Sequence, residues 1–445
     1  MPTSFLKNDI RAMLRIAAPL AFAELGWMSM SVVDNIMVGH LPDSAVAIGA
    51  ASVGGALFSA FAIFGIALMS GLDTLISHAH GANARDEAHV TLMSGTALAL
   101  CLAGPTAFFI LGLTPLLRII GVPGEIRAPA TGFIRVLVWS MPLLFIYTTF
   151  RRYLQGIHYV KPVPFALISA NLVNVLGNWV LIYGHWGFPA MGIRGSALST
   201  VLARVYLAGT MVVAVYRRDP DAFRAPRVRW ERISHLLRLG LPAALTTGFE
   251  VGIFNATTAL VAKLGPVSLA AHTIALNAAS VTFMVPLGIS SAAAVSVGRA
   301  VGAKDPHAAA RAGWTAIGLG LTFEVCSALA FLLLPRTIAR AYTRDDAVIS
   351  FAIRLLWIAA AFQLFDGAQT VATGALRGLG DTRTPMIWNF VCYWVIGLPV
   401  GCWLGFGLNW GAAGFWWELC VALMVIGIAL IATWSKRSRV QHGHS

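Results

Sequence analysis

The chain has 445 residues, of which 58% are hydrophobic and 11% are charged. Soluble domains carry about 25% charged residues, so this composition excludes an ordinary soluble protein and predicts a polytopic membrane protein. The 32 lysines and arginines outnumber the 19 acids. In a soluble protein that excess would suggest nucleic-acid binding, but in a chain with long uncharged segments it predicts membrane orientation and no nucleic-acid partner.

The first half of the chain contains six apolar segments long enough to cross a bilayer. A hydrocarbon core of roughly 30 Å needs about 20 residues of helix. Each segment reaches that length with few charged residues. We predict helices at residues 14–37, 45–69, 92–115, 128–150, 163–184 and 192–215.

Polar side chains gather at two places in these six helices. Asp34 lies toward the outer end of the first helix. The fifth and sixth helices carry amides and hydroxyls at helical spacings, which either join the helices by hydrogen bonds or, if they face Asp34, supply oxygen ligands for Na⁺ or tune its proton affinity. They are Asn171, Asn174, Asn178, Ser196 and Thr200.

The longest polar connection follows the sixth predicted helix. It contains Pro220 and Pro226, and arginines crowd into it from Arg217 to Arg238. We expect a cytoplasmic basic linker over residues 217–237. It separates an N-terminal six-helix lobe at 1–216 from a C-terminal six-helix lobe at 238–445.

Six further apolar segments follow the linker. They meet the same length criterion, so the fold class is an all-α membrane protein with twelve transmembrane helices. These helices leave few residues for a soluble domain. The predicted helices cover residues 238–262, 269–294, 313–334, 350–374, 385–406 and 411–434.

Two carboxylates lie near the middle of predicted helices in the second half. An ionisable group at the bilayer centre costs at least about 2.5–3.5 kcal/mol, so such a residue is a functional candidate. Glu250 in the seventh helix and Asp366 in the tenth are both flanked by glycine and small polar residues, and Gln363 and Gln369 lie within three residues of Asp366. The remaining acids within helices are weaker candidates, being close to a helix end or among apolar neighbours, and they are Glu24, Asp73, Glu324 and Glu418.

Paired carboxylates in a low dielectric suggest a coupling mechanism. Both cannot ionise cheaply, so one is protonated or a cation such as Na⁺ is recruited. Uptake of H⁺ or Na⁺ would then weaken binding of a cationic substrate, and that exchange is the basis of antiport. Trp27, Phe249 and Phe362 are candidates to line a cavity for flat lipophilic cations.

The basic residues predict the orientation of the chain. If the N-terminus is inside, the inner segments hold 22 of the 32 lysines and arginines, the outer connections hold 7, and 3 lie within helices. Because basic residues are retained on the cytoplasmic side, both termini are expected to be cytoplasmic.

The two halves repeat each other at an offset of about 220 residues. Pro19 in RIAAPLA corresponds to Pro242 in RLGLPAA, 223 residues later, and HLPDSAVA corresponds to KLGPVSLA at the same offset. Six helices per repeat place both copies in the membrane in the same sense. This predicts parallel repeats related by an axis along the membrane normal.

Several of these segments resemble one known family. LRGLGDTRTP at Leu376–Pro385, DNIMVGHL from Asp34, LVAKLGPVSLAAHTI and NLVNVLGNWVLIYG are similar to motifs of the multidrug and toxic compound extrusion (MATE) transporters. The resemblance covers nearly the whole chain. It implies a V-shaped, two-lobed exporter that expels cationic lipophilic drugs in exchange for Na⁺ or H⁺ by alternating access.

Within that family the chain resembles the NorM branch. Glu250 and Asp366 match its C-lobe cation-binding acids, where the resemblance allows Na⁺ binding, and Asp34 matches the first-helix aspartate. Asn174 matches the fifth-helix asparagine. Asn178 stands where some members have a second acid, and Phe362 where some have tyrosine.

These observations lead to a set of expectations about function. We expect a monomeric secondary active multidrug efflux transporter in the bacterial inner membrane, with no cofactor other than the coupling ion Na⁺ or H⁺. Its partners would be small cationic or amphipathic drugs and dyes and membrane lipid. The alternative within the superfamily is a lipid-linked oligosaccharide flippase, for which a strongly cationic cavity would be expected.

Other classes of protein are less consistent with the sequence. An enzyme is not expected, because no HExxH, GxSxG or P-loop motif occurs and because His78, His80 and His89 fall in a predicted solvated connection. A channel would be distinguished from a carrier by single-channel currents in place of saturable, gradient-coupled flux.

Overall fold

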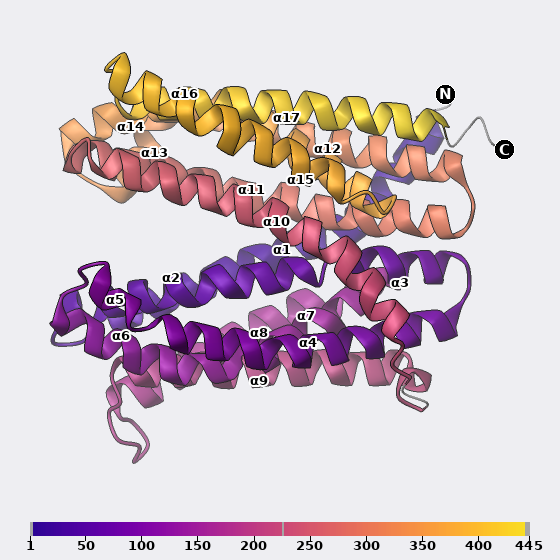
Figure 1. Cartoon of the computed structure of the whole chain (residues 1–445), viewed down its shortest axis with the longest axis horizontal. Coiled ribbons are helices and arrows are strands. Elements are labelled where there is room, and N and C mark those ends of the chain that lie inside the picture. The colour runs from indigo at the N-terminus through magenta and orange to yellow at the C-terminus, as the bar shows by residue number, and fades with distance from the viewer. Residues whose placement is uncertain (1–2, 225–226, 441–445) are drawn as a thin grey trace. The chain divides into compact units, whose positions relative to one another are not determined.

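The computed structural model describes residues 3–224 and 227–440, and all the regular elements in these ranges are helices (Figure 1). The α-helices are α1 Thr3–Val38, α2 Ser44–Leu68, α3 Gly71–Gly81, α4 Arg85–Leu113, α5 Leu116–Ile119, α6 Gly124–Leu137, α7 Met141–Gly156, α8 Pro162–Tyr183, α9 Ile193–Arg218, α10 Trp230–Ala262, α11 Pro266–Gly302, α12 Pro306–Leu333, α13 Pro335–Tyr342, α14 Asp346–Gly378, α15 Arg383–Asn389, α16 Leu398–Cys402 and α17 Ala412–Val440.

The twelve predicted membrane spans are confirmed within the described residues. Twelve helical segments are long and apolar enough to cross a membrane. Most are longer than predicted, because helices continue past their apolar cores into polar turns. The second span, for example, extends through α3 to Gly81, and the third begins at Arg85.

This extension corrects the expected position of three histidines. His78 and His80 lie in α3 and His89 lies in α4, so none of them is in a loop. The ring Nε2 of His89 lies 2.9 Å from Asp219 Oδ2. The connection between the two spans is only residues 82–84, because the polar residues on either side have side-chain partners within the bundle.

The chain divides into two compact units within two of its helices. One unit comprises residues up to Ala21 together with Leu241 onward, and the other comprises Phe22–Gly240. We call them the C-terminal unit and the N-terminal unit. The divisions fall inside α1 and α10, close to the repeat-related prolines Pro19 and Pro242.

This division differs in two places from the two lobes predicted from the sequence. The start of α1 belongs with the C-terminal unit, and α10 begins at Trp230, so residues 230–237 of the predicted linker are helical. The prediction used apolarity alone. It therefore missed a helical turn with polar side chains such as Arg232, which pairs with Glu87 of α4.

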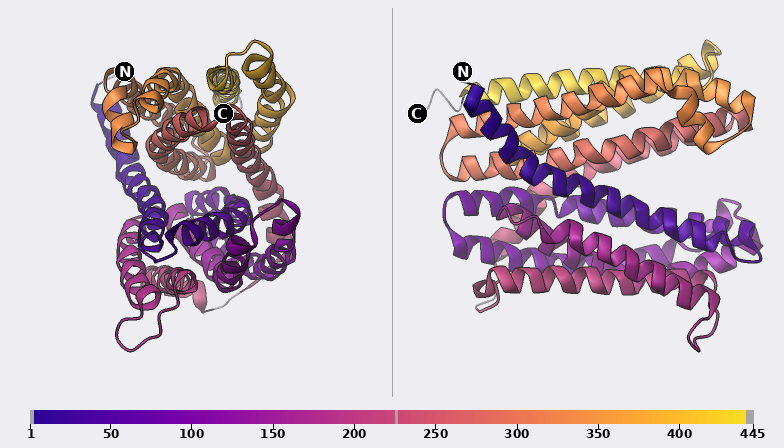
Figure 2. Two further views of the ribbon diagram at one scale, coloured as in Figure 1. Left: turned by 90° about the vertical axis from the view of Figure 1, so that its left-hand side faces the viewer. Right: turned by 180° about the vertical axis from the view of Figure 1, so that it is seen from behind.

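Each unit is a bundle of helices (Figure 2). In the C-terminal unit, α14 packs against α11, α12 and α17. In the N-terminal unit, α9 packs against α6, α7 and α8. The central helices α14 and α9 carry Asp366 and Thr200 respectively, so these polar side chains lie inside bundles.

The eleventh span contains two π-helical segments that were not predicted. They cover Phe390–Gly397 and Trp403–Gly407. Gly397, Gly401 and Gly405 recur every four residues and pack against α17, where an added Cβ would lie 2.1 Å from Glu418 Oε1 and 2.4 Å from Phe415 Cε2 at the first and last positions. This stripe of small residues allows the close approach of α17.

Candidate functional site

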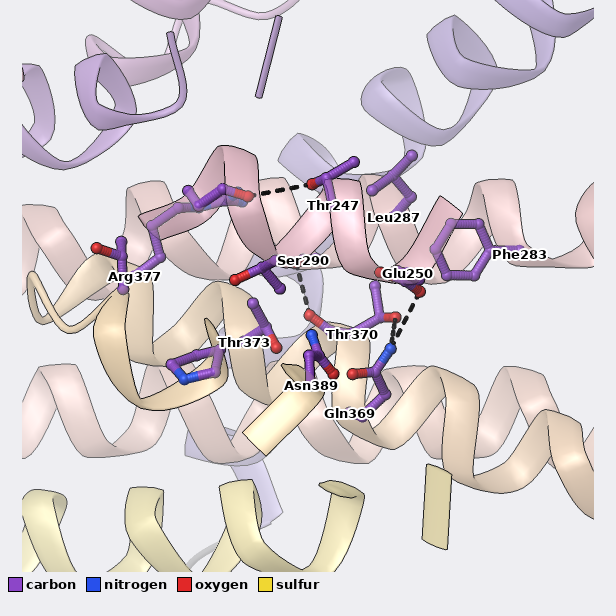
Figure 3. A pocket seen from close by; sticks show the side chains of 14 residues that line it. Thr247, Glu250, Phe283, Leu287, Ser290, Gln369, Thr370, Thr373, Arg377 and Asn389 are labelled. Carbon is purple, nitrogen blue, oxygen red and sulfur yellow. Dashed lines mark hydrogen bonds between the residues drawn. The ribbon is translucent and has the colours of Figure 1, made fainter. Parts of the chain in front are cut away.

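A small polar cavity lies inside the C-terminal unit beside Glu250 (Figure 3). Its volume is about 80 Å³. Drug-binding pockets are about 300–1,000 Å³, so this cavity suits an ion or a few waters better than a drug. Glu250 comes from α10, Phe283 and Ser290 from α11, and Gln369 from α14. Most of the other lining residues are threonines, and Arg377 and Asn389 also line the cavity.

Gln369 connects the two predicted coupling carboxylates. Its Nε2 donates to Glu250 Oε1 at 3.2 Å, as Figure 3 shows. Asp366 lies one turn earlier on α14 and is 5% exposed. The amide of Gln369 and the charge of Glu250 both act on the Asp366 carboxylate.

These two acids have no basic partner. In the part of the chain that the structure describes, neither Glu250 nor Asp366 forms an ion pair. Asp366 Oδ1 is buried and has no hydrogen-bond donor. The charge of Glu250 acts on Asp366, and two like charges repel strongly in a low dielectric, so this arrangement favours the uptake of a proton or another cation.

A third carboxylate, Glu324, lies close to this pair. It is 1% exposed on α12, and its charge acts on Asp366. Gly367 permits the contact, because a Cβ there would lie 2.3 Å from Glu324 Cγ. Its apolar sequence neighbours made it a weak candidate, and sequence alone does not show which face of α12 meets α14.

The other predicted residues of the C-terminal unit have different surroundings. Gln363 donates to Ser327 Oγ at 2.8 Å and to Thr282, and so joins α14 to α12 and α11. Phe362 is 1% exposed and packs between Phe254 and Trp416, so it belongs to the core of the unit in this structure.

Phe249 is only half-buried. Its ring packs against Phe390 with centroids 5.0 Å apart, and its backbone carbonyl accepts a hydrogen bond from Trp394 Nε1 at 3.1 Å. Phe249 therefore holds α10 against the π-helical segment of the eleventh span.

In the N-terminal unit, Asn178 and Thr200 of the predicted polar set contact Asp34, whereas Asn171 donates to the Gly26 carbonyl instead. Asn178 Nδ2 donates to Asp34 Oδ1 at 2.6 Å, and Thr200 donates to Asp34 Oδ2 at 3.3 Å. Asn178 also donates to Asn174 Oδ1 at 3.3 Å. Ser196 contributes its backbone carbonyl, which accepts from Thr200. The group therefore both surrounds the acid and joins α8 to α9.

Arg204 is a charged neighbour of this group to which the sequence analysis assigned no role. It lies one turn after Thr200 on α9, is 8% exposed, and its positive charge acts on Asp34. Its guanidinium donates to Ser140 and lies 4.7 Å from the centroid of the Phe58 ring. No carboxylate among the described residues forms an ion pair with it.

Two of the weaker acidic candidates have basic partners. Glu24 pairs with Arg151, and Asp73 pairs with Arg152, both from α7. Trp27, a candidate cavity aromatic, stacks on Tyr147 with centroids 6.1 Å apart. These contacts give all three side chains a packing role in the N-terminal unit.

Comparison with known proteins supports the repeat and the fold. The MatE family profile matches the chain twice, at residues 19–180 and 242–403. The two matches begin at the repeat-related prolines, which confirms the internal duplication.

The chain is similar over almost its full length to bacterial proteins named "Probable multidrug resistance protein NorM". The protein of Mesorhizobium japonicum is 36% identical over 99% of this chain and 96% of the relative. That of Burkholderia mallei is 38% identical over 97% and 93%.

Solved structures of transporters share the fold at lower identity. An outward-facing multidrug resistance MATE family transporter has a TM-score of 0.89 at 18% identity and covers 98% of this chain and 97% of that one. The eukaryotic MATE transporter AtDTX14 has a TM-score of 0.87 at 18% identity, with 99% of each chain covered. From the twofold family match and the full-length relatives, the chain belongs to the MatE family, whose members are transporters and not enzymes.

Proposed function

We propose that the protein is a multidrug efflux transporter that exports cationic lipophilic compounds in exchange for H⁺ or Na⁺. Family membership and the names of the relatives support multidrug efflux. Support for the exchange mechanism comes from Glu250 and Asp366. They lie in the membrane-spanning part of the chain, form no ion pair among the residues that the structure describes, and are both influenced by Gln369.

The chemistry of exchange follows from competition for negative charge. When H⁺ or Na⁺ occupies Glu250 and Asp366, the pair loses its attraction for a cationic drug. When the ion leaves, the carboxylate charge is no longer neutralised, which costs several kcal/mol in a low dielectric. Binding of a cationic drug removes that cost. Alternating access then couples inward ion movement to outward drug movement.

Asp34 is proposed as a second coupling acid, in the N-terminal unit. Asn178 and Thr200 donate to its two oxygens, so its charged form has hydrogen bonds even without a metal ion. Arg204 adds a positive charge nearby. This set favours a proton over Na⁺ as the ion that Asp34 exchanges, because a second cation beside Arg204 would be repelled.

The flippase alternative has less support. It requires a cation-rich cavity for a pyrophosphate-linked substrate. The wall of the cavity in the C-terminal unit includes Glu250 and one base, Arg377, with mainly hydroxyl and amide groups between them.

Dye efflux from inverted membrane vesicles tests the proposal. Vesicles are energised separately by a pH gradient and a Na⁺ gradient, and ethidium transport is followed for the parent, Glu250→Gln and Asp366→Asn. We expect efflux with at least one gradient in the parent and background rates in both variants, because neutral amides cannot exchange an ion.

Glu418→Gln is the matched control, because Glu418 is another buried acid of the C-terminal unit that packs against Gly397 and Gly401. It should retain gradient-driven efflux, and all variants should elute as monodisperse protein. Parental rates in both Glu250→Gln and Asp366→Asn would show that this pair does not couple transport.

A further inference from the structure

A large groove in the C-terminal unit lies apart from the coupling carboxylates. Its volume is about 980 Å³, and its walls come from α12, α17 and the beginning of α1. None of the coupling residues Glu250, Asp366 and Gln369 lines it. The groove therefore has no place in the proposed exchange mechanism.

One complete face of α12 forms the long wall of the groove. The wall runs from His307 through Trp314 and Gly318 to Thr322, with lining residues recurring every three or four positions. These sixteen residues of helix extend about 24 Å, which is comparable to the depth of one bilayer leaflet plus its headgroup region. Beside Gly318 no heavy atom lies within 4 Å of where a Cβ would be, so the wall is open there.

The two ends of this groove differ in chemistry. At one end Arg311 of α12 and Arg439 of α17 line it together, with Ser435 of α17 as a further polar group. Beyond them the wall consists mainly of Trp314, which is 42% exposed, Gly318 and Leu319. The groove is thus basic at one end and largely apolar along its length.

The basic end retains a positive charge after its internal ion pair is counted. Asp9 Oδ2 lies 3.6 Å from Arg311 Nε, but the Arg311 side chain is 49% exposed and can contact a second anion. Arg439 is exposed and forms no ion pair among the described residues. A cationic drug would be repelled by this end, whereas a phosphate would be attracted.

We propose that this groove binds an anionic glycerophospholipid of the predicted cytoplasmic leaflet. The phosphate contacts Arg311 and Arg439, and an acyl chain lies along α12 from Trp314 toward Thr322. The orientation agrees with the positive-inside prediction, since the basic end lies beside the connection that holds Lys304. Basic grooves between membrane helices on the cytoplasmic side are suited to such headgroups.

Lipid binding to the purified protein tests the assignment without any transport assay. Native mass spectrometry in detergent would compare phosphatidylglycerol with phosphatidylcholine on the parent and on the double variant Arg311→Gln/Arg439→Gln. The parent should prefer phosphatidylglycerol, and the double variant should bind it at least about tenfold more weakly, because two charged contacts are lost.

Lys304→Gln/Arg383→Gln is the matched control, because it removes the same charge from the same predicted side of the C-terminal unit but outside the groove. It should bind phosphatidylglycerol like the parent. Equal weakening in both double variants would indicate unspecific attraction and overturn the proposal, as would equal binding of the two lipids by the parent.

Quenching of tryptophan fluorescence locates the acyl chain. Phosphatidylglycerol with a brominated acyl chain should quench the parent more than Trp314→Phe, and the difference should disappear in the Arg311→Gln/Arg439→Gln variant. Identical quenching of the parent and Trp314→Phe would show that the lipid does not occupy this groove.

Discussion

Acids within the membrane spans of this chain have two kinds of surroundings. Glu24 and Asp73 each pair with an arginine of α7, whereas Glu250 accepts from Gln369 and neither it nor Asp366 forms an ion pair within the described residues. A buried ion pair satisfies its charges internally, but an unpaired carboxylate in a membrane must be protonated or bind a cation. The position of an acid within a membrane span therefore does not by itself identify a coupling residue. The side chains around the acid must also be known.

Arg204 provides a residue-level prediction for the N-terminal unit. The groups that act on Asp34 are the amides of Asn174 and Asn178, the Thr200 hydroxyl and the Arg204 charge. Arg204→Met removes the positive charge and makes deprotonated Asp34 less stable. In the proposed exchange a cationic ligand needs the deprotonated acid, so the pH of half-maximal tetraphenylphosphonium binding should move upward.

Arg204→Lys keeps the charge and serves as the comparison. Its midpoint should lie closer to that of the parent than to that of Arg204→Met. If all three proteins bind with the same pH dependence, Arg204 does not influence Asp34.

Asp219, which follows the sixth span, provides a prediction about pH and stability. Burial raises its pKa, but hydrogen bonds from Tyr153, at 2.6 Å, and His89, at 2.9 Å, together with the charges of His89 and Arg85, outweigh this effect and lower the pKa below its ordinary value of 3.8. A lowered pKa contributes stability above pH 3.8 that is lost as the pH falls through the folded-state pKa. Asp219→Asn should therefore lower the unfolding free energy by about 1–3 kcal/mol at pH 7 and by less below pH 4.

Thermal unfolding in detergent at several pH values measures this difference. Asp221→Asn is the control, because its pair with Arg224 is exposed and worth less than about 1 kcal/mol. A pH-independent difference between Asp219→Asn and the parent would argue against a role for the Asp219 charge.

At the scale of elements, glycines decide how closely the helices pack. Gly313 of α12 lies against Trp434 of α17, where an added Cβ would be 1.9 Å from Trp434 Cζ2. Gly367 similarly admits Glu324 beside α14. These contacts were not predicted, because a glycine in an apolar helix has the same sequence appearance whether it faces a neighbour or lipid.

Gly313→Ala should therefore separate α12 from α17. Trp434 is fully buried and has little room to move, so we expect a loss of about 1–3 kcal/mol in stability from overpacking. Gly318→Ala on the same helix meets no atom within 4 Å and should be neutral or stabilising by up to about 1 kcal/mol. Melting temperatures of the two variants in detergent test the contact, and equal values would contradict it.

At the scale of the whole molecule, residues that correspond in the two sequence repeats occupy corresponding helices. The family match starts at Pro19 and again at Pro242, and each proline lies in a helix that passes from one compact unit to the other. Equivalent positions in the two repeats therefore have equivalent places in the fold. The acids are an exception, since Asp34 is surrounded by hydrogen-bond donors and Arg204, whereas Glu250 and Asp366 lie near a further acid.

The sequence by itself determined the twelve spans, their duplication and the family. Apolar length is a local property that adds up along the chain, and family motifs are likewise read from consecutive residues. It also identified Glu250, Asp366 and Asp34 as charges whose burial needs an explanation.

The tertiary structure alone decided which of these charges have partners. It showed that Glu24 and Asp73 are paired, that Glu324 lies beside Asp366, that Arg204 faces Asp34 and that Phe362 is in the core. These facts depend on which faces of distant helices meet. Helical periodicity defines the faces of each helix, but the packing of α7, α9, α12 and α14 within the bundles determines which side chains they bring together.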